Sequence, residues 1–217
     1  MCNLYRIETS QQAMRRLFGI ADDRLGNLPL LDGVYPDQLA PVVHGDGDGR
    51  TAEMMRWGFP PPASARRPVT NVRNLDSPFW RSWLARPAQR CLVPATAFCE
   101  YEGEVGAKAK RWFALRETDD DGRARPFAFA GIWREWSGMR GKEQGTHRLF
   151  SILTTEPNGV VAPIHPKAMP VLLADAAAFE RWLQAPWPEA AALAAPFPDE
   201  RMRLLPDQPE PVPLFAG

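Results

Sequence analysis

The apolar positions of this chain alternate or run together over short stretches, a pattern typical of β-strands. Turns rich in glycine and charged residues separate these stretches. The connections are too short for regular helical crossovers between parallel strands, so the sheet is predicted to be largely antiparallel. The expected strands cover 39–44, 53–59, 90–101, 111–116, 126–136, 147–155 and 168–173. Turns are expected at 45–49, 103–110, 118–125 and 137–146, with an extended loop at 60–62.

A few helices are predicted between the strands. The first begins at a capping box over 9–12, carries Met14, Leu17 and Phe18 on one face, and ends at Gly19. Two more are expected after the N-caps Ser77 and Asp175. The helix after Ser77 carries Phe79, Trp80, Trp83 and Leu84. Short helices at intervals along a strand-rich chain indicate an α+β fold.

Length and composition agree with a folded domain. The chain has 217 residues, 45% of them hydrophobic and 24% charged, which excludes wholesale disorder. We predict a single domain over 1–217. The 23 prolines argue against a helical bundle. Residues 186–217 form a proline-rich tail, expected to pack on the body or to be partly loose.

The cysteine content favours a reduced, cytoplasmic protein. Cys2, Cys91 and Cys99 are odd in number and lack the paired spacing of a zinc site, so neither a disulfide framework nor a metal is expected. No cofactor is predicted. No apolar run reaches the roughly 20 residues of a membrane span, and the N-terminus lacks the apolar core of a signal peptide.

Charge is balanced overall but not along the chain. The sequence has 26 basic and 26 acidic residues, yet residues 54–115 hold 10 basic and 4 acidic side chains. This middle third therefore creates a local positive field, suited to phosphates or simply to a solvated face.

The second residue suggests a specific chemistry. Removal of Met1 would leave Cys2 with a free amine next to its thiol. Such a pair traps aldehydes, because the amine forms an imine and the thiolate then closes a five-membered thiazolidine. A cysteine near a frayed terminus is the plain alternative.

Three further segments carry candidate chemistry. Asn71 and Arg73 lie two apart on an extended segment and so share a side. Glu100 follows a nearly continuous apolar run, where burial would raise its pKa toward that of a general acid or base. His165 lies in a proline-flanked, non-helical segment that would hold an imidazole in place. Each has a plain reading as a turn, a strand exit or a solvated loop.

Taken in order, the motifs of this chain resemble the SRAP (SOS response-associated peptidase) family of abasic-site-processing proteins. The motifs are MCNLY at 1–5, WGFP at 57–60, TNVR at 70–73, RCLVPATAFCEY at 90–101, FAGIW at 129–133 and IHPKAMPVLL at 164–173. The resemblance implies an α+β body with a central, barrel-like antiparallel sheet and a basic DNA groove. It also implies a covalent thiazolidine link from Cys2 to abasic sites in single-stranded DNA.

The resemblance places the family's active-site residues on Cys2, Asn71, Glu100 and His165. His165 would assist opening of the sugar, Glu100 would take a proton from the Cys2 amine or thiol, and Asn71 would bind a sugar hydroxyl or position the N-terminus. β-Elimination from the same imine would give lyase activity. The residues expected to hold phosphates are Arg73, Arg66, Arg67, Arg81, Arg86 and Lys167, and Trp57 and Phe59 would stack on a base.

The chain departs from the family pattern at several positions. Asn3 and Leu4 replace the usual glycine and arginine after Cys2, and Cys99 and Tyr101 replace the aromatics around Glu100. Two alternative functions remain open: a cysteine hydrolase or peptidase with Cys2 as nucleophile and His165 as base, which includes self-processing of Met1, and a non-catalytic single-stranded DNA-binding module. We expect a monomer that does not bind membranes.

Overall fold

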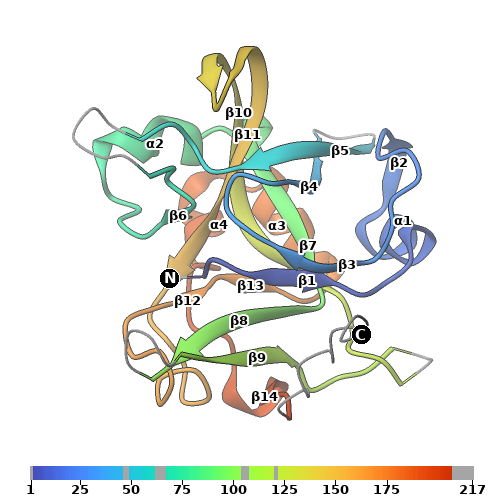
Figure 1. Cartoon of the computed structure of the whole chain (residues 1–217), viewed down its shortest axis with the longest axis vertical. Helices are drawn as coiled ribbons and strands as arrows, with labels where there is room; N and C mark the ends of the chain where they lie inside the picture. Colours follow the sequence, from blue (N-terminus) through green and yellow to red (C-terminus); the bar gives the residue numbers. More distant parts are fainter. Residues whose placement is uncertain (1, 46–48, 62–66, 104–107, 120–121, 207–217) are drawn as a thin grey trace, which may run out of the picture.

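The computed structural model describes residues 2–45, 49–61, 67–103, 108–119 and 122–206 (Figure 1). The strands are β1 (Tyr5–Ile7), β2 (Ile20–Asp23), β3 (Leu31–Val34), β4 (Leu39–His44), β5 (Arg50–Trp57), β6 (Asn71–Val72), β7 (Arg90–Ala95), β8 (Ala97–Glu102), β9 (Ala109–Leu115), β10 (Phe127–Arg140), β11 (Glu143–Thr155), β12 (Met169–Pro170), β13 (Leu172–Leu173) and β14 (Met202–Leu204). The helices are α1 (Gln11–Phe18), α2 (Pro78–Leu84), α3 (Ala176–Gln184) and α4 (Trp187–Ala191), with 3-10 turns η1 (Pro87–Gln89) and η2 (Asp199–Arg201).

Five strands close into a barrel. The ring runs β11-β10-β7-β4-β5 and returns to β11, because β5 pairs with β11 in parallel at Arg56↔Leu149 and Trp57↔Phe150. The other pairings in the ring are antiparallel. A second sheet, β14-β9-β8-β1-β3, lies in the lower half of Figure 1. The predicted α+β fold with a largely antiparallel, barrel-like sheet and short helices is confirmed.

The segment 90–101, predicted as one strand, is two strands in different sheets. The chain leaves the barrel at Thr96, which has no exposed surface. Its hydroxyl accepts a hydrogen bond from the Glu8 amide at 3.0 Å and lies 3.2 Å from the Arg6 carbonyl, to which it donates. The Arg6 carbonyl also accepts the Thr96 amide at 2.8 Å, so the backbone groups of Glu8, Arg6 and Thr96 are paired at the change of sheet. The bend carries Glu100 out of the barrel and into β8.

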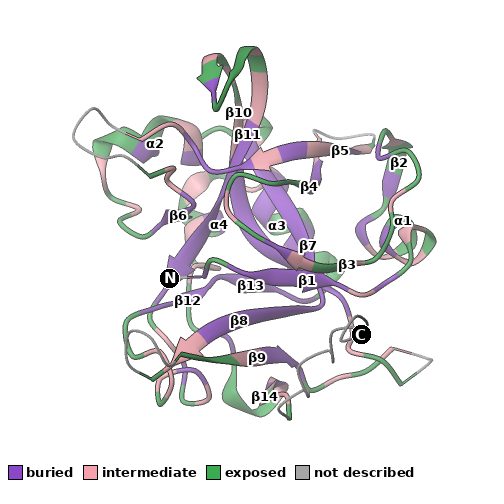
Figure 2. Cartoon of the chain, viewed as in Figure 1, coloured by how far each residue is buried: buried purple, intermediate pink, exposed green. Residues whose placement is uncertain are grey.

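Aromatic rings tie the two sheets together. Tyr5 of β1 meets Trp57 of β5 edge-to-face at a centroid distance of 5.1 Å, and Phe129 of β10 at 5.4 Å. Each such pair contributes about 0.5–1.5 kcal/mol beyond simple burial. Figure 2 shows the buried residues concentrated along the barrel strands and β1. The start of the chain is therefore anchored in the core.

The helix signals are largely confirmed. The N-cap of α1 is Ser10 rather than Thr9, because the Ser10 hydroxyl accepts the Ala13 amide at 3.2 Å. Gly19 ends α1 with φ +60°, a conformation that favours glycine. The predicted caps Ser77 and Asp175 accept amides of α2 and α3.

Two strand boundaries differ from the prediction. The turn expected at 137–146 is mostly strand, since β10 and β11 stay paired from Gly131↔Ile152 to Arg140↔Glu143. The charged residues there lie on the faces of a long hairpin, which explains why they resembled a turn. The strand expected at 168–173 is two short ones: β12 pairs with β11 and β13 with β10.

Some predicted loops lie partly outside the described residues: 46–48 of the glycine turn, residue 62 of the proline loop and 207–217 of the tail. The described part of the tail packs on the body, because β14 pairs with β9. Within the described ranges, no helix is long and apolar enough to cross a membrane.

Candidate functional site

Cys2 is held in the core at the start of the chain. It has no exposed surface, and its Sγ lies 3.5 Å from the carbonyl oxygen of Leu4. The same Leu4 carbonyl accepts the Cys99 amide of β8 at 2.9 Å, so β1 and β8 remain paired up to this point. Met1 lies outside the described residues.

Asn71 links a distant strand to the backbone of Cys2. Its Nδ2 donates to the Cys2 carbonyl at 2.9 Å and to the Thr70 hydroxyl at 2.8 Å. Thr70 is fixed in turn, because its carbonyl accepts the indole N–H of Trp57 at 3.0 Å and the Ile152 amide at 3.1 Å. These bonds and the parallel pairing of β6 with β11 hold the Asn71 side chain against the N-terminal segment.

The amide oxygen of Asn71 is an unused acceptor. It is buried and accepts no hydrogen bond from any residue in the described part of the chain. A buried polar atom without a partner is costly, so such an atom beside a reactive group suggests that a ligand completes it.

Glu100 is a buried carboxyl beside Cys2. Glu100 is 2% exposed, and burial raises the pKa of its carboxyl above the ordinary value. The charge of the nearby His165 lowers this pKa in part. Burial also raises the pKa of the Cys2 thiol well above its ordinary range, and the Glu100 charge raises it further. The resting thiol is therefore protonated, and Glu100 is closer to neutral than a surface carboxyl.

His165 faces Glu100 with a defined ring nitrogen. Its Nδ1 lies 2.8 Å from the carbonyl oxygen of Ala168, and its Nε2 lies 3.9 Å from Oε2 of Glu100. A carbonyl oxygen only accepts, so Nδ1 carries the proton and Nε2 has the lone pair in the neutral ring. Proton exchange between His165 and Glu100 needs only a small approach.

The structure thus connects the four predicted residues through three pairwise interactions. Asn71 contacts Cys2, His165 faces Glu100, and the charge of Glu100 acts on the Cys2 thiol. Among the described residues, no group of three or more His, Cys, Asp and Glu is arranged to hold a metal ion.

The family model described as SOS response associated peptidase (SRAP) matches residues 1–209. The chain belongs to the SRAP family. Two curated relatives come from Bacillus subtilis (strain 168). The abasic site processing protein YoaM is 30% identical over 148 residues, which are 65% of this chain and 60% of YoaM. The abasic site processing protein YobE is 28% identical over 149 residues, 65% of this chain and 63% of YobE. The SRAP chain thus spans less than two thirds of either relative.

Solved structures share the fold. A Bordetella bronchiseptica protein matches with a TM-score of 0.71 and 23% identity, over 94% of this chain and 98% of that one. A Bacteroides thetaiotaomicron protein has a TM-score of 0.71 and 22% identity, over 94% and 90%. A phage-related protein of B. bronchiseptica has a TM-score of 0.71 and 20% identity, over 96% and 95%. At these identities the likeness establishes the barrel architecture.

Two departures of this SRAP chain from the family pattern are accommodated locally. The side-chain oxygen of Asn3 accepts a hydrogen bond from the Thr70 hydroxyl at 3.4 Å, so its extra bulk has a polar partner. Cys99 is buried against β1, where burial raises the pKa of its thiol to about 11.

The predicted stacking residues are not at the surface. Trp57 is 0% and Phe59 2% exposed, so the expectation that they stack on a base disagrees with their positions. Trp57 ends β5 and its ring packs in the core, because strand alternation directs it inward.

The predicted phosphate contacts are scattered. Arg67, Arg81, Arg86 and Lys167 are exposed, and Arg66 lies outside the described residues. The side chain of Arg73 is 38% exposed. Its guanidinium already donates to three acceptors: the carbonyls of Thr155 and Lys167, and the Glu156 carboxylate.

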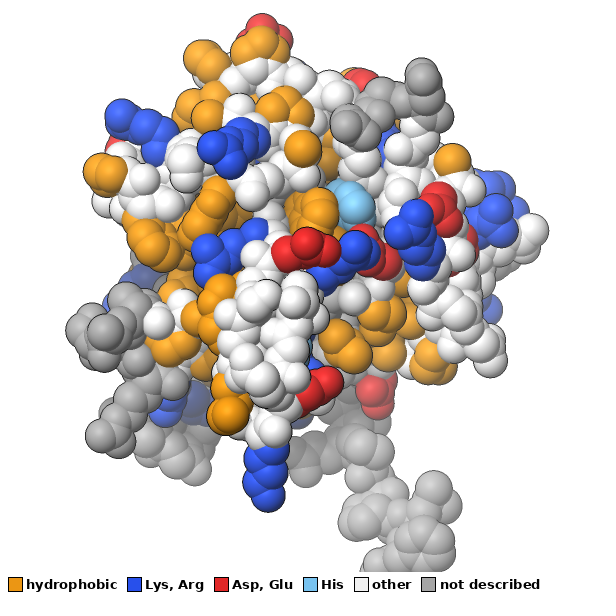
Figure 3. All heavy atoms as spheres, turned by 90° about the horizontal axis from the view of Figure 1, so that it is seen from above, with side chains coloured by type: hydrophobic (Ala, Val, Ile, Leu, Met, Phe, Trp, Pro, Cys, Tyr) orange, Lys and Arg blue, Asp and Glu red, His pale blue; other side chains and the backbone are white. Residues whose placement is uncertain are grey.

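An exposed aromatic surface on α2 was not singled out from the sequence. Phe79 is 55% exposed and meets Trp83 at 5.3 Å, while the Arg134 guanidinium of β10 stacks over Trp83 at 4.7 Å. The spacing of Phe and Trp after Ser77 was the only signal for this surface in the sequence, but this spacing predicts an apolar helix face without showing whether the face is exposed. From the side of the β10–β11 hairpin, basic and hydrophobic side chains lie side by side (Figure 3).

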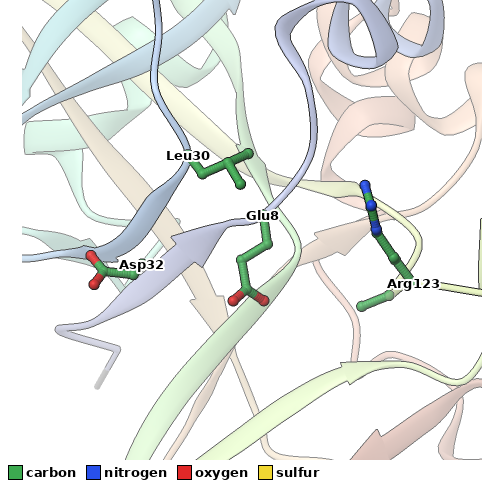
Figure 4. A pocket seen from close by; sticks show the side chains of 5 residues that line it. Glu8, Leu30, Asp32 and Arg123 are labelled. Atoms are coloured by element: carbon green, nitrogen blue, oxygen red, sulfur yellow. The ribbon is translucent and has the colours of Figure 1, made fainter. Parts of the chain in front are cut away.

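One cavity of the SRAP chain lies away from these residues. It has a volume of about 500 Å³ and is lined by Glu8, Leu30, Asp32, Arg123 and Ala124 (Figure 4). None of the four predicted catalytic residues lines it.

Proposed function

We propose that this chain processes abasic sites in single-stranded DNA, by a covalent thiazolidine link through Cys2 once Met1 is removed. The observation that carries the proposal is the N-terminal arrangement: Asn71 bonds to the Cys2 carbonyl, the Glu100 charge acts on the Cys2 thiol, and His165 faces Glu100. The family membership and the names of the Bacillus relatives support the same substrate.

The chemistry needs only groups that Cys2 supplies. The free amine attacks the C1′ aldehyde of the ring-opened sugar, and loss of one water gives the imine. The thiolate then adds to the imine carbon, and the imine nitrogen takes up the proton that the thiol released. The five-membered ring closes with a net loss of one water, and no oxidant or metal takes part.

The neighbouring residues have separate roles in this proposal. In its protonated form, His165 donates the Nε2 proton to the sugar ring oxygen and takes up the proton of the C1′ hydroxyl as the aldehyde forms. Glu100 is a carboxyl of raised pKa that accepts a proton from the Cys2 amine and returns it as water leaves. The free oxygen of Asn71 binds the new N-terminal amine or a sugar hydroxyl. If ring closure lags, removal of a C2′ proton from the imine cleaves the strand at the 3′ phosphate.

DNA is held by the exposed surface around α2 in this proposal. Phe79 and Trp83 offer ring surface for unpaired bases, and Arg81 and Arg86 of the same region are exposed for phosphates. The protein acts as a monomer in a reducing compartment, where its three buried free cysteines stay reduced.

The hydrolase alternative is less consistent with the raised pKa of the Cys2 thiol. An activated cysteine nucleophile has a lowered pKa, whereas burial raises that of Cys2. The aldehyde trap tolerates a protonated resting thiol, because the amine reacts first.

The deciding experiment is intact mass spectrometry of the protein mixed with a single-stranded oligonucleotide that carries one abasic site. Wild type and Cys2→Ser are compared, and the mass of each free protein is recorded first. We expect an adduct equal to protein minus Met1 plus DNA minus one water, absent in Cys2→Ser. Protein that lacks Met1 yet forms no adduct would contradict the proposal. Salt-sensitive binding that ignores both Cys2→Ser and the abasic site would favour a plain DNA-binding module.

A further inference from the structure

Arg73 connects three segments of the chain at the edge of the site. Its Nη1 donates to the Thr155 carbonyl at 2.9 Å and to the Lys167 carbonyl at 2.7 Å, and its Nη2 pairs with the Glu156 carboxylate. Thr155 ends β11, and Lys167 lies in the segment that follows His165. One guanidinium therefore ties the strand next to Asn71 to the loop of the histidine.

The Lys167 carbonyl lies next to the group that orients the imidazole. It belongs to the peptide bond leading into Ala168, and the carbonyl of Ala168 accepts the proton of His165 Nδ1 at 2.8 Å. That bond leaves Nε2 directed toward Glu100, 3.9 Å away. A displacement of the 167–168 peptide would therefore turn the ring.

Backbone contacts hold the segment on both sides of this peptide, and downstream Met169 of β12 pairs with Thr155 of β11. Pro166 and Pro170 have no N–H, so the segment lacks two backbone donors. Upstream, the His165 amide donates to the Val161 carbonyl at 2.9 Å. Charge-assisted bonds to backbone carbonyls are about twice as strong as neutral ones, which suits Arg73 to holding the Lys167 carbonyl between these two attachments.

We infer that Arg73 is a positioning residue that holds His165 in register with Glu100, rather than chiefly a phosphate contact. A guanidinium that moved to a phosphate would give up two backbone bonds that fix the loop. The exposed pair with Glu156, whose side chain is 72% exposed, adds little by itself. This inference rests on the proposed function for its kinetic consequence, but not for the position of the ring.

The test separates rate from affinity. Adduct formation is measured at saturating single-stranded abasic DNA over a range of pH, and affinity is measured over a range of salt. We expect Arg73→Gln to lower the saturating rate by at least about tenfold and to alter its pH profile, because a misplaced catalytic group is costly, with the dissociation constant within about twofold of wild type. Arg73→Lys should recover part of the rate, since an ammonium can reach one carbonyl but lacks the planar fork.

Two comparison variants calibrate these readouts. Arg81→Gln removes an exposed charge of α2 and should weaken binding and lower the salt slope by about 1, with the saturating rate kept. Lys142→Gln removes an exposed charge at the hairpin tip and should leave both unchanged. If Arg73→Gln instead behaves like Arg81→Gln, the positioning role is wrong.

A DNA-free measurement keeps the inference independent of the proposed function. Ring nitrogen NMR of the free protein should show His165 as the Nδ1–H tautomer in wild type, with that preference reduced in Arg73→Gln. Unchanged His165 signals would overturn the inference even if adducts form, whereas a wild type without adducts would overturn the function alone. If Arg73→Gln does not fold by circular dichroism, Arg73→Lys decides in its place.

Discussion

The side-chain amide of Asn71 donates to the carbonyl oxygen of Cys2 at 2.9 Å, across 69 positions of sequence. This bond joins the N-terminal segment to a short strand that is held in parallel against β11. It fixes the reactive residue from its backbone, so the amine and thiol of Cys2 remain unconstrained by that bond. In the proposed function, this bond would align Cys2 and leave its amine and thiol available.

Replacement of Asn71 tests that alignment. Asn71→Asp removes the donor and places a carboxylate against a carbonyl oxygen, so the N-terminal segment should shift. We expect adduct formation at saturating DNA to fall by about 10–100-fold, with little change in affinity. The control is Asn74→Ala, which removes an exposed amide three residues along. Equal rates for Asn71→Asp and wild type would show that the bond has no catalytic role.

Glu100 should make the protein less stable above acidic pH. Because its pKa is raised by burial, the folded state holds the proton more tightly than the unfolded state. Stability therefore falls as pH rises from the unfolded value of about 4.3 through the higher folded pKa, and then levels off. Glu100→Gln should raise the melting temperature at pH 8, by about 2–4 °C for each kcal/mol regained, and should have little effect near pH 4. Thermal unfolding at both pH values measures this, and a gain confined to acidic pH would contradict the assignment.

His165 should matter most when the sugar must open. With a natural abasic site, which is mainly a closed hemiacetal, we expect His165→Ala to slow adduct formation by about 10²-fold. An oligonucleotide with a permanently acyclic aldehyde needs no ring opening, so His165→Ala should slow that reaction far less. Rapid-quench kinetics on the two substrates gives the comparison. An equal decrease in the rate on both substrates would show that His165 acts after the sugar ring has opened.

The α2 surface should determine affinity rather than rate. Phe79→Ser removes an exposed ring next to Trp83, and loss of one stacked base costs about 1–3 kcal/mol. We expect the dissociation constant for single-stranded DNA to rise by about tenfold while the rate at saturation is kept. Leu30→Ser, which removes an apolar side chain that is 65% exposed at the large cavity, is the matched control. If the two variants bind alike, the α2 surface is not the DNA contact.

Helices α1, α2 and α3 were predictable because their signals are local, whereas α4 lies in the segment predicted only as a proline-rich tail. Ser77, Asp175 and Gly19 act on backbone groups within one turn, and the structure has caps at all three. The N-cap of α1 was displaced by one residue, because Thr9 and Ser10 are both suitable caps and only the chain entering from β1 decides between them. The longer strands were also predictable, since alternation depends on nearest neighbours. The short strands β1, β2, β3, β6 and β14 were not predicted.

The sequence by itself determined the family motifs, the strand-rich α+β fold and the residue types available at the site. Only the tertiary structure decided that 90–101 changes sheets at Thr96, that Trp57 and Phe59 lie in the core, and that Arg73 bonds to the histidine loop. The physical reason is that an extended run looks the same whichever sheet it joins, and that a side chain's partners depend on strands paired from distant positions. Long-range pairing of β1 with β8 and of β6 with β11 is what places Cys2, Asn71, Glu100 and His165 in one region.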